Sequence, residues 1–397
     1  MKAVMNEASQ VKEEIIEGVD NSYVMVTEDD ALHALCREWK QCSFLAMDTE
    51  FIRTTTFFPQ VGLVQINAGQ GNVLVDPLGI EDWTPFSELM VDPSIVKVFH
   101  SCSEDLQVFM ASMQLVPTPI FDTQIAASLL NVGFGCSYQN LVRHYMDIEL
   151  PKGETRSDWL QRPLQEKQLL YAALDVACLP EIYLAQRESL EKDNRLSWQE
   201  EECRTLVGIY EREMEGDFSA YYLAIRGAWQ MSQRELGVLK LLAEWRELRA
   251  RKRDKPRNWI IKEKQLIDIA KYCPRDMNEL KKIDDLDKNF LRHEGSEVIH
   301  LVEKALALPE DDLPDSMPAP LDGGAKNKLK RAQQFAMKKA EELQLPVEML
   351  MRKRWLITLL QNLRDYPEAS VDDNLPQELK GWRYDQLLPG MIEAVST

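Results

Sequence analysis

The sequence lacks the features that mark secreted and membrane-spanning proteins. Its seven cysteines form no Cys-x-x-Cys pair and no disulfide-like spacing, which is typical of a reducing compartment. No apolar run follows Lys2 within the first twenty residues, so we expect no signal peptide. No stretch reaches membrane-spanning length either. Together these absences predict a cytoplasmic protein without a membrane partner.

Positive charge is also scarce. The formal net charge of the 397 residues is -18, which argues against nucleic-acid binding by the surface as a whole and requires any such contact to be a local patch. Hydrophobic residues make up 45% of the chain, so it can bury the cores of two or three domains.

Two carboxylates interrupt an apolar segment, 44–51, that reads as a buried strand. Because strand side chains alternate between faces, Asp48 and Glu50 share one face, while Met47 and Thr49 share the other. Adjacent carboxylates in an apolar setting are costly to ionise without a cation, and hard oxygen ligands select Mg²⁺ or Mn²⁺. A strand end with solvated acids is the alternative, and the Asp-x-Glu triplet alone does not decide between them.

Periodicity along the first half of the chain predicts an α/β domain. Strands are expected at 23–26, 44–51, 61–66, 72–76, 95–99 and 120–121, and helices at 27–40, 104–113, 123–130, 138–146 and 164–190. The short turn at 68–71 predicts that the sheet opens antiparallel. The later alternation of strands and helices predicts parallel strands covered by helices.

Two further acids lie where such a fold could bring them to the first pair. Asp105 follows the point at which the strand 95–99 gives way to a helix, a common position for functional residues. Asp175 follows Tyr171 by one helical turn, which places hydroxyl and carboxylate on one helix face. Taken alone, Asp105 could be an acid at a helix N-terminus that is stabilised by the helix dipole. Asp175 could likewise be a solvated acid beside a tyrosine that only packs in the core.

Taken in this order, Asp48-x-Glu50, Asp105 and Tyr171-x-x-x-Asp175 resemble the three exonuclease motifs of the DEDD superfamily in its tyrosine subclass. Neighbouring segments that resemble the ribonuclease D family are 47–51, 57–65, 100–105 and 121–124. Segments similar to helicase-and-RNase-D C-terminal (HRDC) modules, in two copies, are 249–251, 256–259 and 381–383.

His100 has the spacing to Asp105 that marks the histidine subclass of the same superfamily. In that subclass the histidine motif comes last, whereas here it precedes 122–124 and the helix that carries Tyr171 and Asp175. We therefore expect His100 to be structural.

The resemblance implies a ribonuclease H-like (DnaQ-like) α/β exonuclease domain with a mixed sheet, followed by two all-α HRDC-like domains. It implies a 3′–5′ exoribonuclease that releases nucleoside 5′-monophosphates and acts in 3′ maturation of tRNA precursors and other structured RNA. We predict no protein partner. Two divalent cations, Mg²⁺ or Mn²⁺, are expected at the catalytic acids, and Tyr171 is expected to orient the attacking water. The implied metal ligands are Asp48, Glu50, Asp105 and Asp175.

Two other functions stay open. A 3′–5′ DNA exonuclease of proofreading or repair type would carry the same acids, and the HRDC-like modules favour the ribonuclease. A nucleic-acid-binding adaptor with an inactive nuclease domain would be expected to have lost at least one of the four acids or the tyrosine, and all five are present.

Composition and pattern divide the chain into six parts. They are an N-terminal extension expected to be disordered (1–22), the exonuclease domain (23–215), a connector (216–231), HRDC-like domain 1 (232–308), an acidic proline-rich linker (309–322) and HRDC-like domain 2 (323–397).

Local basic patches are candidates for RNA binding. Residues 246–264 include nine basic and three acidic side chains, although a charge run is often only a solvated helix face. The predicted nucleic-acid-binding residues are Phe57, Phe58, Arg251, Lys252, Arg253 and Trp259. The two phenylalanines are expected to stack on the last bases, with core packing as the alternative. A second basic stretch, Lys326 to Lys339, could bind RNA or belong to a domain that packs on the exonuclease domain.

Overall fold

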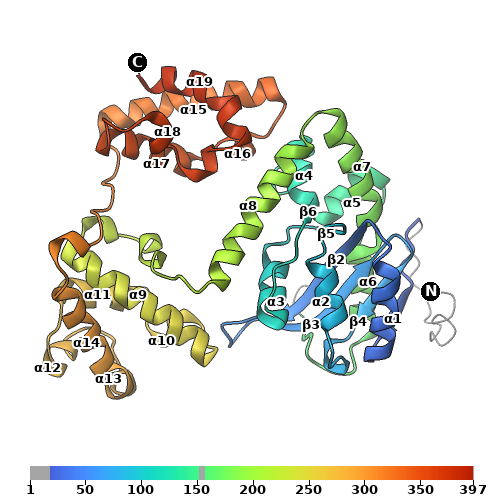
Figure 1. Cartoon of the computed structure of the whole chain (residues 1–397), viewed down its shortest axis with the longest axis horizontal. Helices are drawn as coiled ribbons and strands as arrows, with labels where there is room; N and C mark the ends of the chain where they lie inside the picture. Colours follow the sequence, from blue (N-terminus) through green and yellow to red (C-terminus); the bar gives the residue numbers. More distant parts are fainter. Residues whose placement is uncertain (1–17, 152–156, 397) are drawn as a thin grey trace.

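Strand β2 (Phe44–Ile52) lies in the interior of a six-stranded mixed sheet with helices on both faces (Figure 1). The computed structural model describes residues 18–151 and 157–396. Across the sheet the strand order is β1-β4-β3-β2-β5-β6. The other strands are β1 (Tyr23–Val26), β3 (Gln60–Asn67), β4 (Asn72–Val75), β5 (Val96–Phe99) and β6 (Ile120–Asp122).

Strand directions confirm the predicted mixed sheet. β2 pairs antiparallel with β3, and β3 pairs antiparallel with β4. β2 pairs parallel with β5, which pairs parallel with β6. Gly69 and Gly71, with φ of 80° and 113°, supply the left-handed conformations of the turn between β3 and β4.

The two faces of β2 pack on different helices. Leu45 and Met47 are fully buried in a core shared with α1, α2 and α3, whereas Ala46 lies in a core shared with α4, α5 and α7. These helices and their neighbours are α1 (Asp29–Trp39), η2 (Pro77–Gly79), α2 (Thr84–Met90), α3 (Ser103–Met113), α4 (Thr123–Leu129), α5 (Tyr138–Met146), α6 (Glu166–Ala177), α7 (Leu179–Lys192) and α8 (Leu196–Met214).

The helices α6 and α7 correct the prediction that no stretch reaches membrane-spanning length. Among the described residues, the 27-residue segment Glu166–Lys192, which comprises α6 and α7, is long and apolar enough for a span, and 56% of its apolar window is buried inside the protein. Pro180 lies in the first turn of the second helix, and Ala172 and Ile182 are fully buried in cores of the sheet domain. The apolar character is therefore that of a core helix pair.

The start of the chain differs in part from the predicted disordered extension. Residues 1–17 lie outside the described part of the chain, but Val19 is buried in the core beside α5. The amide of Asn72 donates to the carbonyls of Asp20 and Ser22, at 2.9 Å each. These contacts hold residues 19–22 against the edge of the sheet, because the buried amide of Asn72 requires partners.

A first helical domain is built around α9 (Gln233–Arg253), whose capping box joins Ser232 and Glu235. Its apolar side chains form a core with the helices that follow. The remaining elements are η3 (Tyr221–Ala224), η4 (Ala228–Gln230), α10 (Arg257–Ile260), α11 (Glu263–Tyr272), α12 (Met277–Leu280), α13 (Lys288–His293) and α14 (Gly295–Leu306).

The second helical domain packs on the sheet domain. Its core is continuous with that of the sheet domain. The rings of Trp198 on α8 and Trp382 are stacked, with their centroids 4.6 Å apart and an angle of 13° between the ring planes. Glu202 accepts from the indole of Trp382 at 2.7 Å and forms an ion pair with Arg383. The segment between the two helical domains contains η5 (Glu310–Asp312), and the elements of the second domain are α15 (Gly323–Leu343), α16 (Val347–Leu350), α17 (Lys353–Asp365), α18 (Val371–Asn374), η6 (Gln377–Leu379) and α19 (Trp382–Ser396). Packing on the exonuclease domain is thus one role of this domain.

Gly381 allows a test of this docking. Its φ is +65°, and an added Cβ would lie 1.6 Å from a carboxylate oxygen of Glu201, which also caps the N–H of Trp382. Gly381→Ala should therefore lower the free energy of unfolding by more than the roughly 1–2 kcal/mol that a left-handed alanine costs. It should also weaken the packing of the second helical domain on the sheet domain. Small-angle scattering and thermal unfolding measure both effects. Gly216→Ala is the matched control, with φ of +81° and no atom within 4 Å of its Cβ; equal losses in the two variants would contradict the prediction.

Candidate active site

Three of the four predicted catalytic acids converge at one face of the sheet. Asp48 and Glu50 come from β2 and Asp175 comes from α6, and one carboxylate oxygen from each lies within 4.8 Å of the others. The alternation of β2 places the first two side chains on the face that α6 covers. The structure thus brings together acids that are separated by 125 residues in the sequence.

Local sequence determines how α6 presents its acid. A capping box between Gln165 and Gln168 begins the helix, and Ala172, which is fully buried against β3 and β4, lets it approach the sheet. Tyr171 and Asp175 share a face, and the tyrosine hydroxyl donates a hydrogen bond to the carboxylate.

The segment before α6 also lies close to the sheet. Trp159 packs over β3 at Gly62, where an added Cβ would lie 2.6 Å from the tryptophan carbonyl oxygen. Its ring centroid is 6.4 Å from that of Tyr171. Arg162 donates to both carboxylate oxygens of Asp76, at 2.6 Å each, and to the Gly62 carbonyl at 2.7 Å. These contacts fix the chain that leads into the helix carrying Tyr171.

The electrostatics of the cluster favour a bound cation. Burial, and next the charge of Asp175, raises the pKa of Asp48 well above its usual value. Burial, followed by the neighbouring carboxylates, raises the pKa of Glu50 to about 10. Burial raises the pKa of Asp175 to about 7, against the opposing hydrogen bond from Tyr171. Converging hard oxygen donors that repel one another when ionised fit a divalent metal ion such as Mg²⁺ or Mn²⁺.

Asp105 borders the cluster but has a different partner. It lies in the first turn of α3, and its Oδ1 accepts a hydrogen bond of 2.5 Å from the hydroxyl of Thr49. Burial and the charge of Asp48 raise its pKa. Helix α3 covers the face of β2 that carries Thr49, so Asp105 approaches from the side opposite α6. Its role as a metal ligand stays a prediction.

Two residues that the sequence reasoning did not assign hold these acids in place. One is Thr49, through its bond to Asp105. The other is Asp122, whose carboxylate accepts hydrogen bonds from the backbone N–H groups of Ser101 and Cys102, just before α3, with N···O distances of 3.1 and 2.9 Å. Asp122 also caps α4, and an acid directly before an apolar helix was the available signal.

His100 lies outside the acid cluster. Its Nδ1 is 2.9 Å from the hydroxyl of Thr123, its ring packs against that of Tyr138, and burial lowers its pKa. These contacts agree with the structural role expected for it.

Phe57 does not have the environment of a base-stacking residue. It is 4% exposed, belongs to the core of the first helical domain, and lies between the guanidinium groups of Arg251 and Arg257, 4.8 and 4.9 Å from its ring centroid. Phe58 is half-buried against the same core, edge-on to Phe57. The structure therefore corrects the stacking role for Phe57 in favour of the core-packing alternative.

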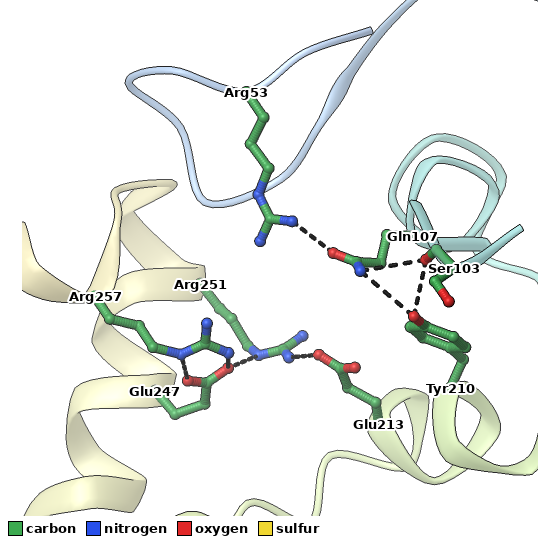
Figure 2. Close-up of polar contacts among 8 residues, drawn as sticks. All are labelled: Arg53, Ser103, Gln107, Tyr210, Glu213, Glu247, Arg251 and Arg257. Atoms are coloured by element: carbon green, nitrogen blue, oxygen red, sulfur yellow. Dashed lines mark hydrogen bonds and ion pairs between the residues drawn. The ribbon is translucent and has the colours of Figure 1, made fainter. Parts of the chain in front are cut away.

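Much of the predicted basic patch is neutralised by acids of this chain. Arg251 forms ion pairs with Glu213 and Glu247, and Glu247 also pairs with Arg257 (Figure 2). Arg253 pairs with Glu294. Arg251 is 15% exposed, so the structure argues against it as a phosphate contact.

Three of the predicted RNA-binding residues remain accessible, and one of them, Arg253, is 46% exposed although it pairs with Glu294. Lys252 is exposed, and Trp259 is 61% exposed at the rim of a cavity of about 450 Å³. Asn258, Lys262 and Asn289 also line this cavity, which suits a polar ligand.

Comparison with known proteins supports the exonuclease domain and the first of the two predicted HRDC-like domains. A family model described as 3′-5′ exonuclease matches residues 23–191, and the HRDC domain model matches residues 235–302. Ribonuclease D of Pseudomonas paraeruginosa is 39% identical over 372 residues, which cover 94% of this chain and 97% of the relative. Ribonuclease D of Escherichia coli is 37% identical over 363 residues, which cover 91% of this chain and 95% of the relative.

The fold agrees with these sequence relationships. The crystal structure of Escherichia coli RNase D matches with a TM-score of 0.83 at 34% identity, over 94% of this chain and 99% of that chain. Together with the mixed sheet and the cluster of acids, this similarity shows that the chain belongs to the ribonuclease D family, as a 3′–5′ exoribonuclease with a ribonuclease H-like exonuclease domain and a C-terminal HRDC region.

Proposed function

We propose that this exoribonuclease hydrolyses RNA from the 3′ end with two divalent cations, Mg²⁺ or Mn²⁺, and releases nucleoside 5′-monophosphates. The observation that carries the proposal is the convergence of the Asp48, Glu50 and Asp175 carboxylates within 4.8 Å. These three residues would hold one ion, and Asp48, with Asp105 directly or through water, the other. Bound there, the ions would supply a nucleophilic water of lowered pKa and neutralise the charge that builds on the scissile phosphate.

The chain's own groups orient the reaction. The hydroxyl of Tyr171 is held by Asp175, and burial together with the neighbouring carboxylates raises its pKa, so the phenol stays protonated at neutral pH. A protonated phenol at this position orients the attacking water by hydrogen bonding. Glu50 would also accept a hydrogen bond from the terminal ribose 3′-OH, which would restrict cleavage to chain ends.

Structured RNA, including tRNA precursors, is the proposed substrate, and the cytoplasm is the proposed location. The crystal structure of the Escherichia coli relative is described as that of an exoribonuclease involved in structured RNA processing. A DNA exonuclease would share the acids, but similarity to ribonuclease D relatives over 94% of this chain favours RNA. The four acids and Tyr171 are all present, which disfavours an inactive adaptor, and we propose no protein partner.

The RNA contacts outside the acid cluster would come from exposed cations and one ring. Trp259 and Lys252 on the first helical domain are accessible, and α15 exposes Lys326, Lys330 and Lys338. Among the described residues, α15 carries no acid before Glu341, in contrast to the paired arginines of α9. These surfaces and the six-part division of the chain remain predictions from the sequence.

A labelled digest tests the activity directly. In Mg²⁺, a 5′-labelled RNA should shorten progressively from its 3′ end, and a 3′-labelled RNA should release nucleoside 5′-monophosphate first. Asp48→Asn, or EDTA with the wild type, should reduce turnover to background, because a neutral amide cannot replace an anionic ligand. A matched DNA strand tests the alternative substrate. Cyclic or 3′-phosphate products would contradict the proposed chemistry.

Tyr171→Phe separates the orientation of water from metal binding. The variant keeps the ring that packs near Trp159 and loses only the hydroxyl. Cleavage should slow by roughly 10²- to 10⁴-fold, as is typical when a proton-handling group is lost. The Mn²⁺ affinity, measured by electron paramagnetic resonance, should change little. Cleavage at the wild-type rate would show that Tyr171 only packs.

The raised carboxyl pKa values predict how stability depends on pH. Between the ordinary carboxyl range and about pH 7, where Asp175 titrates in the fold, the folded metal-free protein binds protons that the unfolded chain has released. Its free energy of unfolding should therefore fall as pH rises, by up to about 1.4 kcal/mol per pH unit for each proton. Saturating Mg²⁺ should remove this part of the slope.

Urea unfolding at pH 5, 6, 7 and 8, in EDTA and in Mg²⁺, measures the difference between the two slopes. Asp175→Asn is the control, since it removes one of the titrating groups and should bring the EDTA slope closer to the Mg²⁺ slope. Identical slopes in EDTA and Mg²⁺ for the wild type would contradict the assigned cluster.

A further inference from the structure

The loop between β2 and β3 is held by a carboxylate of the first helical domain. Helix α9 ends at Arg253, and Asp254 follows as its C-cap in the left-handed conformation, with φ of 48°. Its Oδ1 accepts the backbone N–H groups of Phe57 and Phe58, at 2.9 Å each. One oxygen almost 200 residues away in the sequence thus fixes two consecutive peptides of the loop.

This loop leaves the sheet two residues after Glu50, one of the proposed catalytic acids. The register between β2 and β3 shifts between Glu50 and Phe51, so the strand is irregular at this acid. Pairing with β3 continues only to Ile52, and the loop follows. Where the register shifts, the hydrogen bonds between β2 and β3 hold the strand less firmly than in a regular pair. The path of the loop therefore helps to determine the direction of the Glu50 side chain.

The other side of the loop is tied to the helix that carries Asp105. Arg53 donates to the Gln107 side chain, two residues after Asp105 on α3 (Figure 2). Tyr210 on α8 donates to the carbonyl of Ser103 at 2.8 Å, in the first turn of α3. The loop therefore lies between α3 and the first helical domain, and it contacts both.

Ion pairs hold the same contact together from the helical side. Glu247, whose side chain is 1% exposed, pairs with both arginines that enclose the ring of Phe57, and one of them, Arg251, also reaches Glu213 of α8 (Figure 2). Two guanidinium groups that bind the same buried carboxylate and also pack on one aromatic ring have one preferred arrangement. This contact is a defined support for the loop.

We propose that the first helical domain contributes to catalysis by positioning the β2–β3 loop, and that Asp254 is the positioning residue. The inference rests on the proposed function, because the loop matters through Glu50. It assigns the domain a role in the chemistry of substrates too short to touch the domain itself. The competing interpretation is a contact that only docks the domain.

Two substitutions at Asp254 separate the hydrogen bonds from the backbone conformation. Asp254→Asn keeps an acceptor oxygen and tolerates the left-handed conformation. Asp254→Gly keeps that conformation without strain and removes the acceptor. The matched control is Asp276→Ala, because Asp276 also accepts two backbone N–H groups, at 2.7 and 2.9 Å, but caps α12 away from the loop.

The experiment measures kcat and KM on a trinucleotide RNA in saturating Mg²⁺, with thermal unfolding and scattering for each variant. Asp254→Gly should lower kcat by roughly 10- to 100-fold, the effect expected of a displacement of about 1 Å near a reacting centre. Asp254→Asn should stay within a few fold of wild type. Asp276→Ala should lower the unfolding temperature and leave kcat unchanged.

Several results would overturn the inference. One is a wild-type kcat for folded Asp254→Gly, and another is an equal loss of kcat in Asp254→Asn and Asp254→Gly. A loss of kcat in Asp276→Ala as large as that in Asp254→Gly would assign the effect to general destabilisation. Failure of the proposed function is distinct, since the wild type itself would then leave the trinucleotide intact.

Discussion

Repulsion among three half-buried carboxylates is the constraint on which the rest of the structure depends. Asp48, Glu50 and Asp175 are within 4.8 Å of one another, and burial together with their mutual charge raises each pKa. Such a cluster stays assembled only if the backbone that carries it cannot relax. β2 is paired with β3 along the acids and with β5 over Phe44–Ala46, and α6 is held to the sheet through the fully buried Ala172. A scaffold of this rigidity keeps the oxygens ready for a cation.

The helical domains bear on the same constraint. The first encloses Phe57 and accepts two peptides of the β2–β3 loop at Asp254, so it supports the strand end beyond Glu50. The second stacks Trp382 on Trp198 of the sheet domain. Both helical domains thus use aromatic or arginine side chains for contacts within the protein.

The sequence predicted those features that depend on local periodicity. The helix at 138–146 was placed at its observed bounds, and the antiparallel opening of the sheet followed from the glycine turn at 68–71. The ordered set of acids predicted a site because strand alternation and helical spacing fix which side chains share a face. In the structure, Asp48, Glu50 and Asp175 of this set lie together, with one carboxylate oxygen of each within 4.8 Å of the others.

The sequence could not show which partners distant residues would find. Arg251 looked like part of a basic patch, but Glu213 and Glu247 neutralise it and Phe57 packs beneath it. The ring pair Trp198–Trp382 spans two domains, and nothing in the local pattern of either residue indicates the other. Charge runs and aromatic pairs have the same sequence signature whether they face solvent, RNA or another domain.

The most direct test of the account is anomalous diffraction from crystals soaked in Mn²⁺ at neutral pH with a short 3′-hydroxyl RNA bound. Two anomalous peaks roughly 3.5–4 Å apart are expected beside Asp48, and one of them should also contact Glu50 and Asp175. Absence of any peak within coordination distance of Asp48 at saturating Mn²⁺ would contradict it.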